Sequence, residues 1–342
     1  PAAASSAVPL LLVHAAGVSP RSGQAEMMVR RWVGELAQAL DIAEPIDERT
    51  PADELREAFR SLLQRATVTR RVLVLIDALD QFVIDSPLAW LPAPLPANLR
   101  LVATAISGSA GEAFAQRAGF ASEALAPLDE AAARRIIETL CDRYHHRLNP
   151  RVTQAILARR RPDGGPACSN PLWLTLAVDE MNLLDATDFA RAESEHAAHD
   201  GRHGQGHAAA DWLTPFLLGV AEKLPAEVGP AYQWLLKRAE KLHGEARCRG
   251  FAAPLALARA GLREADFAEL LPQLTGEPWQ PLAFAALRRS FRAHVVARGA
   301  RGQWDFTHAQ MRQAALARYL PDEGQRREMH AVLAAHFGGL EA

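Results

Sequence analysis

The chain has 342 residues, of which 49% are hydrophobic and 23% charged, and its formal net charge is -2. This composition is typical of a globular protein of two or three domains, and it excludes a disordered tail. The near-neutral balance gives no general attraction to nucleic acid or to an anionic membrane surface, so we predict neither as a partner.

Cysteine content and the short apolar runs indicate a cytoplasmic protein. Cys141, Cys168 and Cys248 are isolated, which predicts neither a disulfide framework nor a cysteine zinc site and is consistent with a reducing compartment. The longest apolar runs, 8–16 and 72–76, are far shorter than the about 20 residues that span a bilayer. All but three of the 38 basic residues are arginine, which indicates a bacterial genome of high GC content.

The first part of the chain alternates apolar strands with amphipathic helices. Strands are predicted at 8–16 (VPLLLVHAA), 72–76 (VLVLI) and 99–106 (LRLVATAI), and helices at 25–40 and 51–66. The continuous apolar run of the second strand is the form of a parallel strand covered on both faces. Strands that alternate with helices form a parallel sheet, whose ligand sites lie at the carboxyl ends of the strands.

After the third strand the pattern becomes helical. Asp129 is the predicted N-cap of a helix over 130–144, Pro150 begins a second helix, and Asn170 precedes a third helix that begins at Pro171. No further strand of the buried parallel type follows. A change of domain type is therefore predicted near residue 125.

A polar stretch over 194–210 is rich in glycine and histidine and predicts a loop. Its histidines stand three or four residues apart, a spacing that would place zinc ligands on one face of a helix. Glycines between them argue against a lasting helix, so we favour a solvated linker over a metal site. The histidines concerned are His196, His199, His203 and His207.

Two short β-prone segments late in the chain, 291–296 and 303–306, interrupt a helical region and predict a hairpin. A hairpin that follows several helices suggests a winged-helix domain. Alternation along the second segment predicts Phe306 and His308 on one side, with Phe306 buried, and Asp305 on the opposite side.

The strand at 72–77 ends in Asp77, and Asp80 follows three residues later. P-loop NTPases use an apolar strand that ends in this way to present one carboxylate toward Mg²⁺ and another toward the attacking water. Hard oxygen ligands of this kind suit Mg²⁺. The alternative is a buried strand that simply ends in a solvated acidic loop, and we favour the catalytic interpretation.

The segment VLVLIDALDQ resembles the Walker B segment of STAND-class P-loop NTPases of the NACHT type, in the branch that contains nephrocystin-like and telomerase-associated proteins. Other segments agree with that branch in their order. They are a strand and Ser-rich turn at 13–23, a sensor 1 strand at 98–105, a G-x-P segment at 169–181, and parts of a winged-helix region at 258–271, 304–320 and 330–337.

The resemblance implies ATP hydrolysis with Mg²⁺ and a role for each matching residue. Asp77 would bind Mg²⁺ directly or through water, Asp80 would orient the attacking water, and Thr104 would sense the γ-phosphate. Pro171 would pack on adenine, and His308 would contact the β-phosphate of ADP and hold a closed, inactive state. For His308 the alternative is a histidine that caps the following helix or fills the hairpin.

The chain also departs from the pattern of this family. No G-x-x-x-x-G-K-[ST] motif occurs, so the phosphate-binding loop is absent from these residues. In the family this loop precedes the strand at 8–16, which leaves truncation or evolutionary loss as explanations. We therefore expect the chain alone to bind no nucleotide tightly and to hydrolyse no ATP. Ser169 replaces a family glycine, and Ala105 stands where many relatives have arginine.

The sequence therefore predicts an α/β fold with a partial P-loop NTPase sheet over 1–125, a helical lid over 126–192, a linker over 193–211, and a winged-helix and helical domain over 212–342. The predicted function is the central part of an ATP/ADP-controlled signalling switch, with nucleotide and other protein domains or subunits as partners. The alternative is a non-catalytic scaffold of the same architecture that works through protein–protein interaction.

A third interpretation is a winged-helix DNA-binding regulator. Its recognition helix, near 261–271, would need to be basic. Glu264, Asp266 and Glu269 stand against Arg263 in this segment, and that charge has the wrong sign for DNA.

Overall fold

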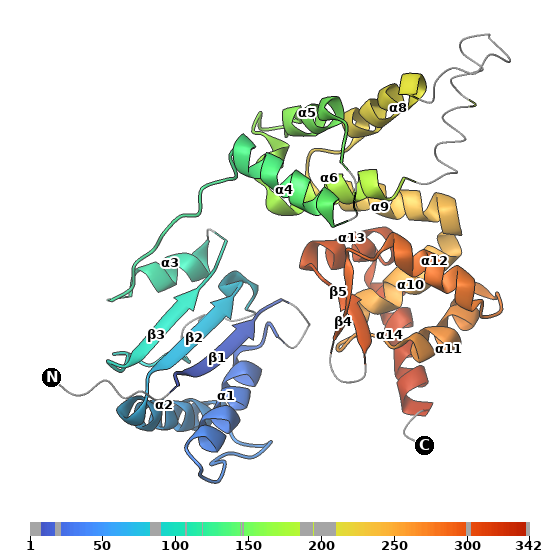
Figure 1. Ribbon diagram of the computed structural model, residues 1–342. Coiled ribbons are helices and arrows are strands. Elements are labelled where there is room, and N and C mark those ends of the chain that lie inside the picture. The colour runs from blue at the N-terminus through green and yellow to red at the C-terminus, as the bar shows by residue number, and fades with distance from the viewer. Residues whose placement is uncertain are drawn as a thin grey trace. The chain divides into compact units, whose positions relative to one another are not determined.

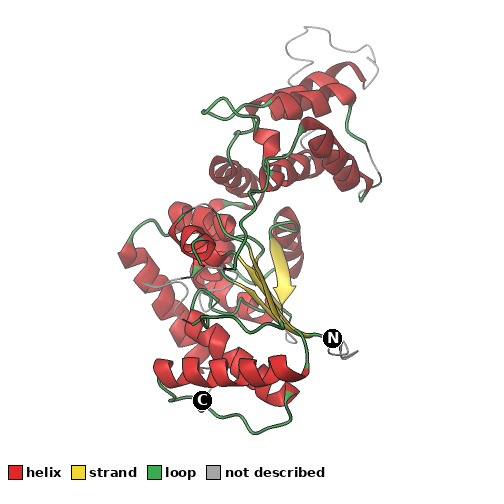
Figure 2. Cartoon of the chain, turned by 90° about the vertical axis from the view of Figure 1, so that its left-hand side faces the viewer, coloured by secondary structure: helices red, strands yellow, loops and turns green. Residues whose placement is uncertain are grey.

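The computed structural model describes residues 8–17, 22–82, 90–106, 108–117, 119–143, 145, 147–184, 194, 210–298 and 302–339. The chain divides into two compact units, an N-terminal unit (1–124) and a C-terminal unit (125–342), each with its own hydrophobic core. Helices make up most of the described chain (Figure 2). No helix in these ranges is both long and apolar enough to cross a membrane. The four histidines of the predicted linker lie outside the described residues.

The N-terminal unit is built on a three-stranded parallel sheet, as predicted (Figure 1). Its strands lie in the order β1 (Leu10–Ala15), β2 (Val72–Asp77) and β3 (Leu99–Ala103). Between β1 and β2 the chain forms α1 (Ala25–Ala39) and α2 (Ala52–Thr69), and after β3 it forms the short helix α3 (Ser109–Ala115), which we did not predict. The register aligns Ala15 with Asp77, so the carboxyl ends of β1 and β2 meet at one edge.

The two faces of this sheet differ in how they are covered. Leu12, Val74 and Ile76 point to one face, are at most 2% exposed and share a core with α1 and α2. The opposite face is also apolar, but it is 39% to 60% exposed at Leu75, Val13, Leu11 and Val102. The prediction that the 72–76 strand is covered on both faces is therefore wrong for the described residues, because both helices between β1 and β2 pack on the same face.

The C-terminal unit is helical apart from one hairpin. Two predicted helix starts are confirmed, since the Asp129 carboxylate accepts a hydrogen bond from the Ala132 N–H and the Asn170 side chain accepts from Leu172 and Trp173. The elements are α4 (Glu130–Asp142), α5 (Pro150–Ala158), α6 (Pro171–Asn182), α8 (Ala210–Lys223), α9 (Val228–His243), α10 (Glu245–Leu257), α11 (Glu264–Thr275), α12 (Pro281–Ser290), β4 (Val295–Arg298), β5 (Gln303–Phe306), α13 (Ala309–Tyr319) and α14 (Glu323–Gly339).

The predicted hairpin is present, with β4 and β5 antiparallel and Val295 opposite Phe306. Phe306 is buried as expected, but Asp305 is equally buried, with 2% of each residue exposed. Alternation along the strand predicted only that Asp305 lies on the side opposite Phe306, and that side is closed by Arg312 of α13, which forms an ion pair with the Asp305 carboxylate. The winged-helix assignment and the predicted boundaries within this unit stay predictions.

Gly261, in the turn between α10 and α11, is expected to be intolerant of a side chain. It has a positive φ of 75°, and a Cβ there would overlap the carbonyl oxygen of Trp304. We expect Gly261→Ala to lower the free energy of unfolding by about 2–3 kcal/mol. Gly276→Ala is the matched control, since its φ is 73° but no atom lies within 4 Å of the added Cβ, and it should cost only about 1 kcal/mol. Equal losses in urea denaturation would contradict this account.

Candidate functional site

The site begins with Asp77 at the carboxyl end of the central strand β2. Thr104 lies directly after β3, and its hydroxyl donates a hydrogen bond of 2.6 Å to Asp77 Oδ1. Asp77 is exposed, and within the described ranges no hydrogen bond reaches its second carboxylate oxygen. Asp77 and Thr104 therefore lie side by side at the carboxyl ends of the neighbouring strands β2 and β3, and one oxygen of Asp77 remains available to a ligand.

Asp80 lies on the same edge, in the short helical turn that follows β2 (Leu79–Gln81). Its Oδ1 accepts a hydrogen bond of 2.9 Å from the Ile106 N–H, and its Oδ2 accepts one of 2.6 Å from Gln81 Nε2. Both oxygens are therefore engaged, and the Ile106 contact ties the loop after β2 to the loop after β3. The bond from the exposed Gln81 side chain is the one that water can replace most easily.

Ala78 joins the two acids through an unusual backbone conformation. Its φ of 59° and ψ of 53° are left-handed, which costs a residue with a Cβ about 1–2 kcal/mol. The Ala78 N–H donates to Thr104 Oγ1 at 2.9 Å and the Leu79 N–H donates to the Thr104 carbonyl oxygen at 2.8 Å, so Thr104 holds this conformation. Strained backbone of this kind gathers at functional sites. Alanine gives no sequence signal for it.

His14 and Gly17 form the part of the edge that follows β1. The His14 Nε2–H donates to the Ser22 carbonyl oxygen at 2.7 Å, and the ring stacks on Phe82 with centroids 5.5 Å apart. Burial lowers the pKa of His14, so the ring is neutral near pH 7. Gly17 has a φ of 74°, and a Cβ there would lie 3.0 Å from Gln81 Cγ. We did not predict either residue, and the long-range contacts that define them have no local sequence pattern.

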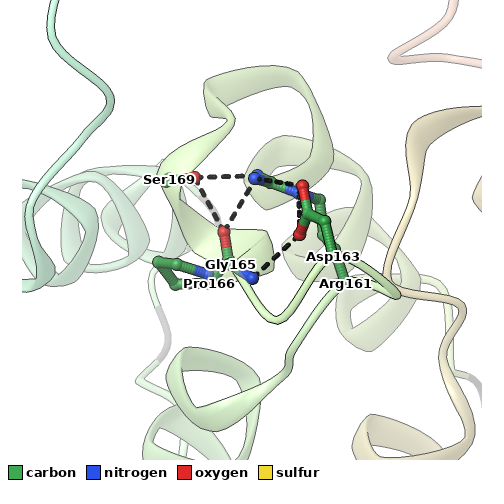
Figure 3. Close-up of polar contacts among 5 residues, drawn as sticks. All are labelled: Arg161, Asp163, Gly165, Pro166 and Ser169. Atoms are coloured by element: carbon green, nitrogen blue, oxygen red, sulfur yellow. Dashed lines mark hydrogen bonds and ion pairs between the residues drawn. The ribbon is translucent and has the colours of Figure 1, made fainter.

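In the C-terminal unit, Pro171 is exposed at the first position of α6. The loop before it is held by the residues in Figure 3, where Arg161 contacts both Asp163 oxygens at 3.0 to 3.2 Å and the Pro166 carbonyl oxygen at 3.2 Å. Ser169 Oγ accepts from Arg161 at 3.1 Å and donates to Pro166 at 2.7 Å. Ser169 therefore helps to fix the loop that leads to Pro171.

His308 occupies the N-cap position of α13, but its side chain makes no capping hydrogen bond. The alternative in which this side chain caps the helix is therefore wrong. The residue is exposed, although the protein around the ring lowers the pKa of the imidazole by burial. A neutral ring retains one N–H donor for an acceptor such as a phosphate oxygen.

The structure brings Asp77, Asp80 and Thr104 together in the N-terminal unit, whereas Pro171 and His308 belong to the C-terminal unit. Among the described residues, no group of three or more His, Cys, Asp or Glu side chains is placed to hold a metal ion. Mg²⁺ differs from most metals here, because it is commonly held by one or two carboxylates while phosphates and water complete its shell.

Comparisons with known proteins add little to this geometry. No protein-family model matches the chain, and no curated protein matches it. Among solved structures, the chain is similar to one described as the Walker-type ATPase PABY2304 of Pyrococcus abyssi, with 14% identity and a TM-score of 0.33 over 90% of this chain and 84% of that chain. At these values the functional argument rests on the residues themselves.

Proposed function

We propose that the chain is the central part of an ATP/ADP-controlled signalling switch of the STAND type. The observation that carries this proposal is the pairing of Asp77 with Thr104 at the carboxyl edge of a parallel sheet, with one Asp77 oxygen available. Asp77 binds Mg²⁺ directly or through water, and Thr104, directly after the adjacent strand, senses the γ-phosphate. Its hydrogen bond to Asp77 links the phosphate sensor to the metal ligand.

Asp80 orients the attacking water in this proposal. Its bond to the Ile106 N–H keeps the carboxylate on the edge, while the bond from Gln81 is exchanged for one to water. Thr104 also holds the left-handed Ala78 between the two acids. Movement of Thr104 toward a γ-phosphate would therefore be transmitted to both carboxylates.

In this proposal the phosphate-binding loop is supplied from outside residues 1–342, because no such motif is present in them. β3 pairs with β2 alone in the described sheet, so its other edge is open to a further strand. A helix that follows such a strand would cover the apolar face of Leu11, Leu75 and Val102. We call a polypeptide that supplies this strand, loop and helix together with the present chain the loop-bearing protein.

The second candidate function is a scaffold that keeps the architecture and binds only protein partners. The absence of a phosphate-binding loop from the sequence is the observation that favours it. The two functions differ in one property, since the switch binds nucleotide in the loop-bearing protein and the scaffold binds none.

The chain by itself is expected to bind Mg²⁺–ATP only weakly. The missing loop supplies the backbone N–H groups and the lysine that bind the phosphates in such proteins. Isothermal titration of residues 1–342 should give no saturable heat at micromolar ATP, whereas the loop-bearing protein should titrate in that range. Micromolar affinity of the chain alone would contradict the assignment of the phosphate site to residues outside it.

In the loop-bearing protein, His308→Ala is expected to speed ADP release by on the order of tenfold, because a hydrogen bond to a charged phosphate is removed. The closed, inactive state that ADP holds is then less favoured, and the basal signalling activity of the loop-bearing protein rises. Release of a fluorescent ADP analogue measures the effect. His330→Ala is the control, since His330 is exposed on α14 and has no proposed contact with nucleotide. If ADP release were unchanged in His308→Ala, the proposed contact with ADP would be wrong, and the alternative in which His308 fills the hairpin would stand.

A further inference from the structure

A histidine of the C-terminal helix α14 is enclosed by two carboxylates. Met329, Leu333 and His336 share one stripe of this helix, and the helix packs against α10. The two apolar side chains are buried with 6% exposed. The His336 side chain is also only 5% exposed, so an ionisable group completes an otherwise apolar docking stripe.

Both ring nitrogens of His336 face acids of α11. Nε2 lies 3.3 Å from Asp266 Oδ1, and Nδ1 lies 3.3 Å from Glu269 Oε2. A neutral imidazole has one N–H and one lone pair, so it can donate to only one of these carboxylates and turns its lone pair toward the other. The protonated ring donates to both. The arrangement is therefore complementary to the imidazolium form.

The charges around this ring favour the same state. Burial raises the pKa of Asp266, but hydrogen bonds from Arg263 and His336 outweigh this effect and leave the pKa below its usual value. Asp266 is therefore ionised across the neutral pH range. Arg263 is bound to Asp266 at 2.7 Å and neutralises one of the two acids. The negative charge of Glu269 then neutralises the positive charge of the imidazolium. Phe337 packs against the ring, with 4.9 Å between the ring centroids.

The charged groups of α10 lie further along the helix. Glu245 and Arg249 line a surface pocket together with Met329, which is about two turns from His336 along α14. These two groups carry opposite charges, so they add little net field at the ring. The charged groups that face the His336 ring directly are therefore Asp266 and Glu269.

We propose that His336 is a proton-dependent clasp that holds the C-terminal helix α14 on α11. The protonated ring is bound at both nitrogens, and loss of the proton replaces one attractive contact by a buried lone pair facing a carboxylate. Removal of the ring proton at higher pH therefore loosens α14. The helix α14 would then be released without unfolding of the rest of the unit.

The clasp is tested by hydrogen exchange of the full chain at several pH values between about 5.5 and 8.5. The exchange rates are corrected for the intrinsic effect of pH. The opening constant of α14 is expected to rise by about tenfold across this range, while that of α9 stays level. An α14 opening constant that is independent of pH would overturn the proposal.

Two variants and a control separate the clasp from a general effect of pH. Glu269→Gln replaces a carboxylate on a side chain that is 65% exposed, and its amide can donate to a neutral ring, so protection of α14 at high pH should increase. His336→Gln should abolish the pH dependence. His330→Gln, on the exposed side of the same helix, should retain it. Retention of the wild-type pH dependence by both His336→Gln and Glu269→Gln would also overturn the proposal.

Discussion

Replacing Asp77 with asparagine is expected to slow ATP hydrolysis by the loop-bearing protein by on the order of 100-fold or more. The reason is that Asp77 presents its available carboxylate oxygen at the edge where Mg²⁺ would bridge protein and phosphates, and an amide oxygen carries no charge to bind the ion. Thr104 can still donate to the amide oxygen, so the edge keeps its hydrogen bond. Steady-state phosphate release at saturating ATP measures the loss.

The stability of this variant should be close to that of the wild type, because Asp77 is exposed. Asp53→Asn is the matched control, since Asp53 is an exposed acid of α2 with 90% of its side chain accessible, and this variant should retain full activity. If Asp77→Asn hydrolysed ATP at the wild-type rate, the assignment of Asp77 as a Mg²⁺ ligand would be contradicted. Loss of activity together with loss of folding would show only a structural role.

Asp305→Ala is expected to lower the free energy of unfolding of the C-terminal unit by about 3–5 kcal/mol. The Asp305 and Arg312 side chains are only 3% and 14% exposed, so removal of the acid leaves a buried guanidinium without its counter-charge. Arg312 also donates to the Leu255 and Ala256 carbonyl oxygens at 3.0 and 2.6 Å, and these contacts prevent it from moving easily into solvent. Urea denaturation followed by far-UV circular dichroism measures the change.

The control for this prediction is an ion pair of the same unit that is open to solvent. Arg327 and Glu323 of α14 lie 3.8 Å apart with 74% and 81% of their side chains exposed, and Glu323→Ala should cost less than about 0.5 kcal/mol. Similar losses in the two variants would contradict the view that burial makes the Asp305 pair important. A large loss in Asp305→Ala alone would support it.

Sequence patterns predicted the parts of this fold that depend on local chemistry. Alternating apolar strands and helices gave a parallel sheet with Asp77 at a carboxyl end, because strand and helix periodicities are read from neighbouring residues. The caps at Asp129 and Asn170 follow from the same local rules.

The features that were missed depend on contacts between distant segments. Ala78 adopts a left-handed conformation because Thr104, which follows another strand, binds its N–H, and alanine gives no local sign of this. His14 and Ser169 gain their roles from Phe82 and Arg161 in the same way. The burial of Asp305 was not predicted either, because alternation along a strand does not include the arginine on the next helix.

The cover of the sheet was also mispredicted for a physical reason. An apolar run such as 72–76 indicates that both faces of a strand favour apolar neighbours, but it does not indicate which segment supplies them. In the described residues α1 and α2 supply one face only. The same open face is the place where the proposed loop-bearing protein would add its helix.

A structure of the loop-bearing protein with Mg²⁺ and a non-hydrolysable ATP analogue tests the central claim most directly. The account predicts Mg²⁺ bound to Asp77 at about 2.1 Å or through a single water, with the γ-phosphate close to the Thr104 hydroxyl. Nucleotide and metal bound away from the Asp77–Thr104 edge, or an empty edge at saturating ligand, would contradict it.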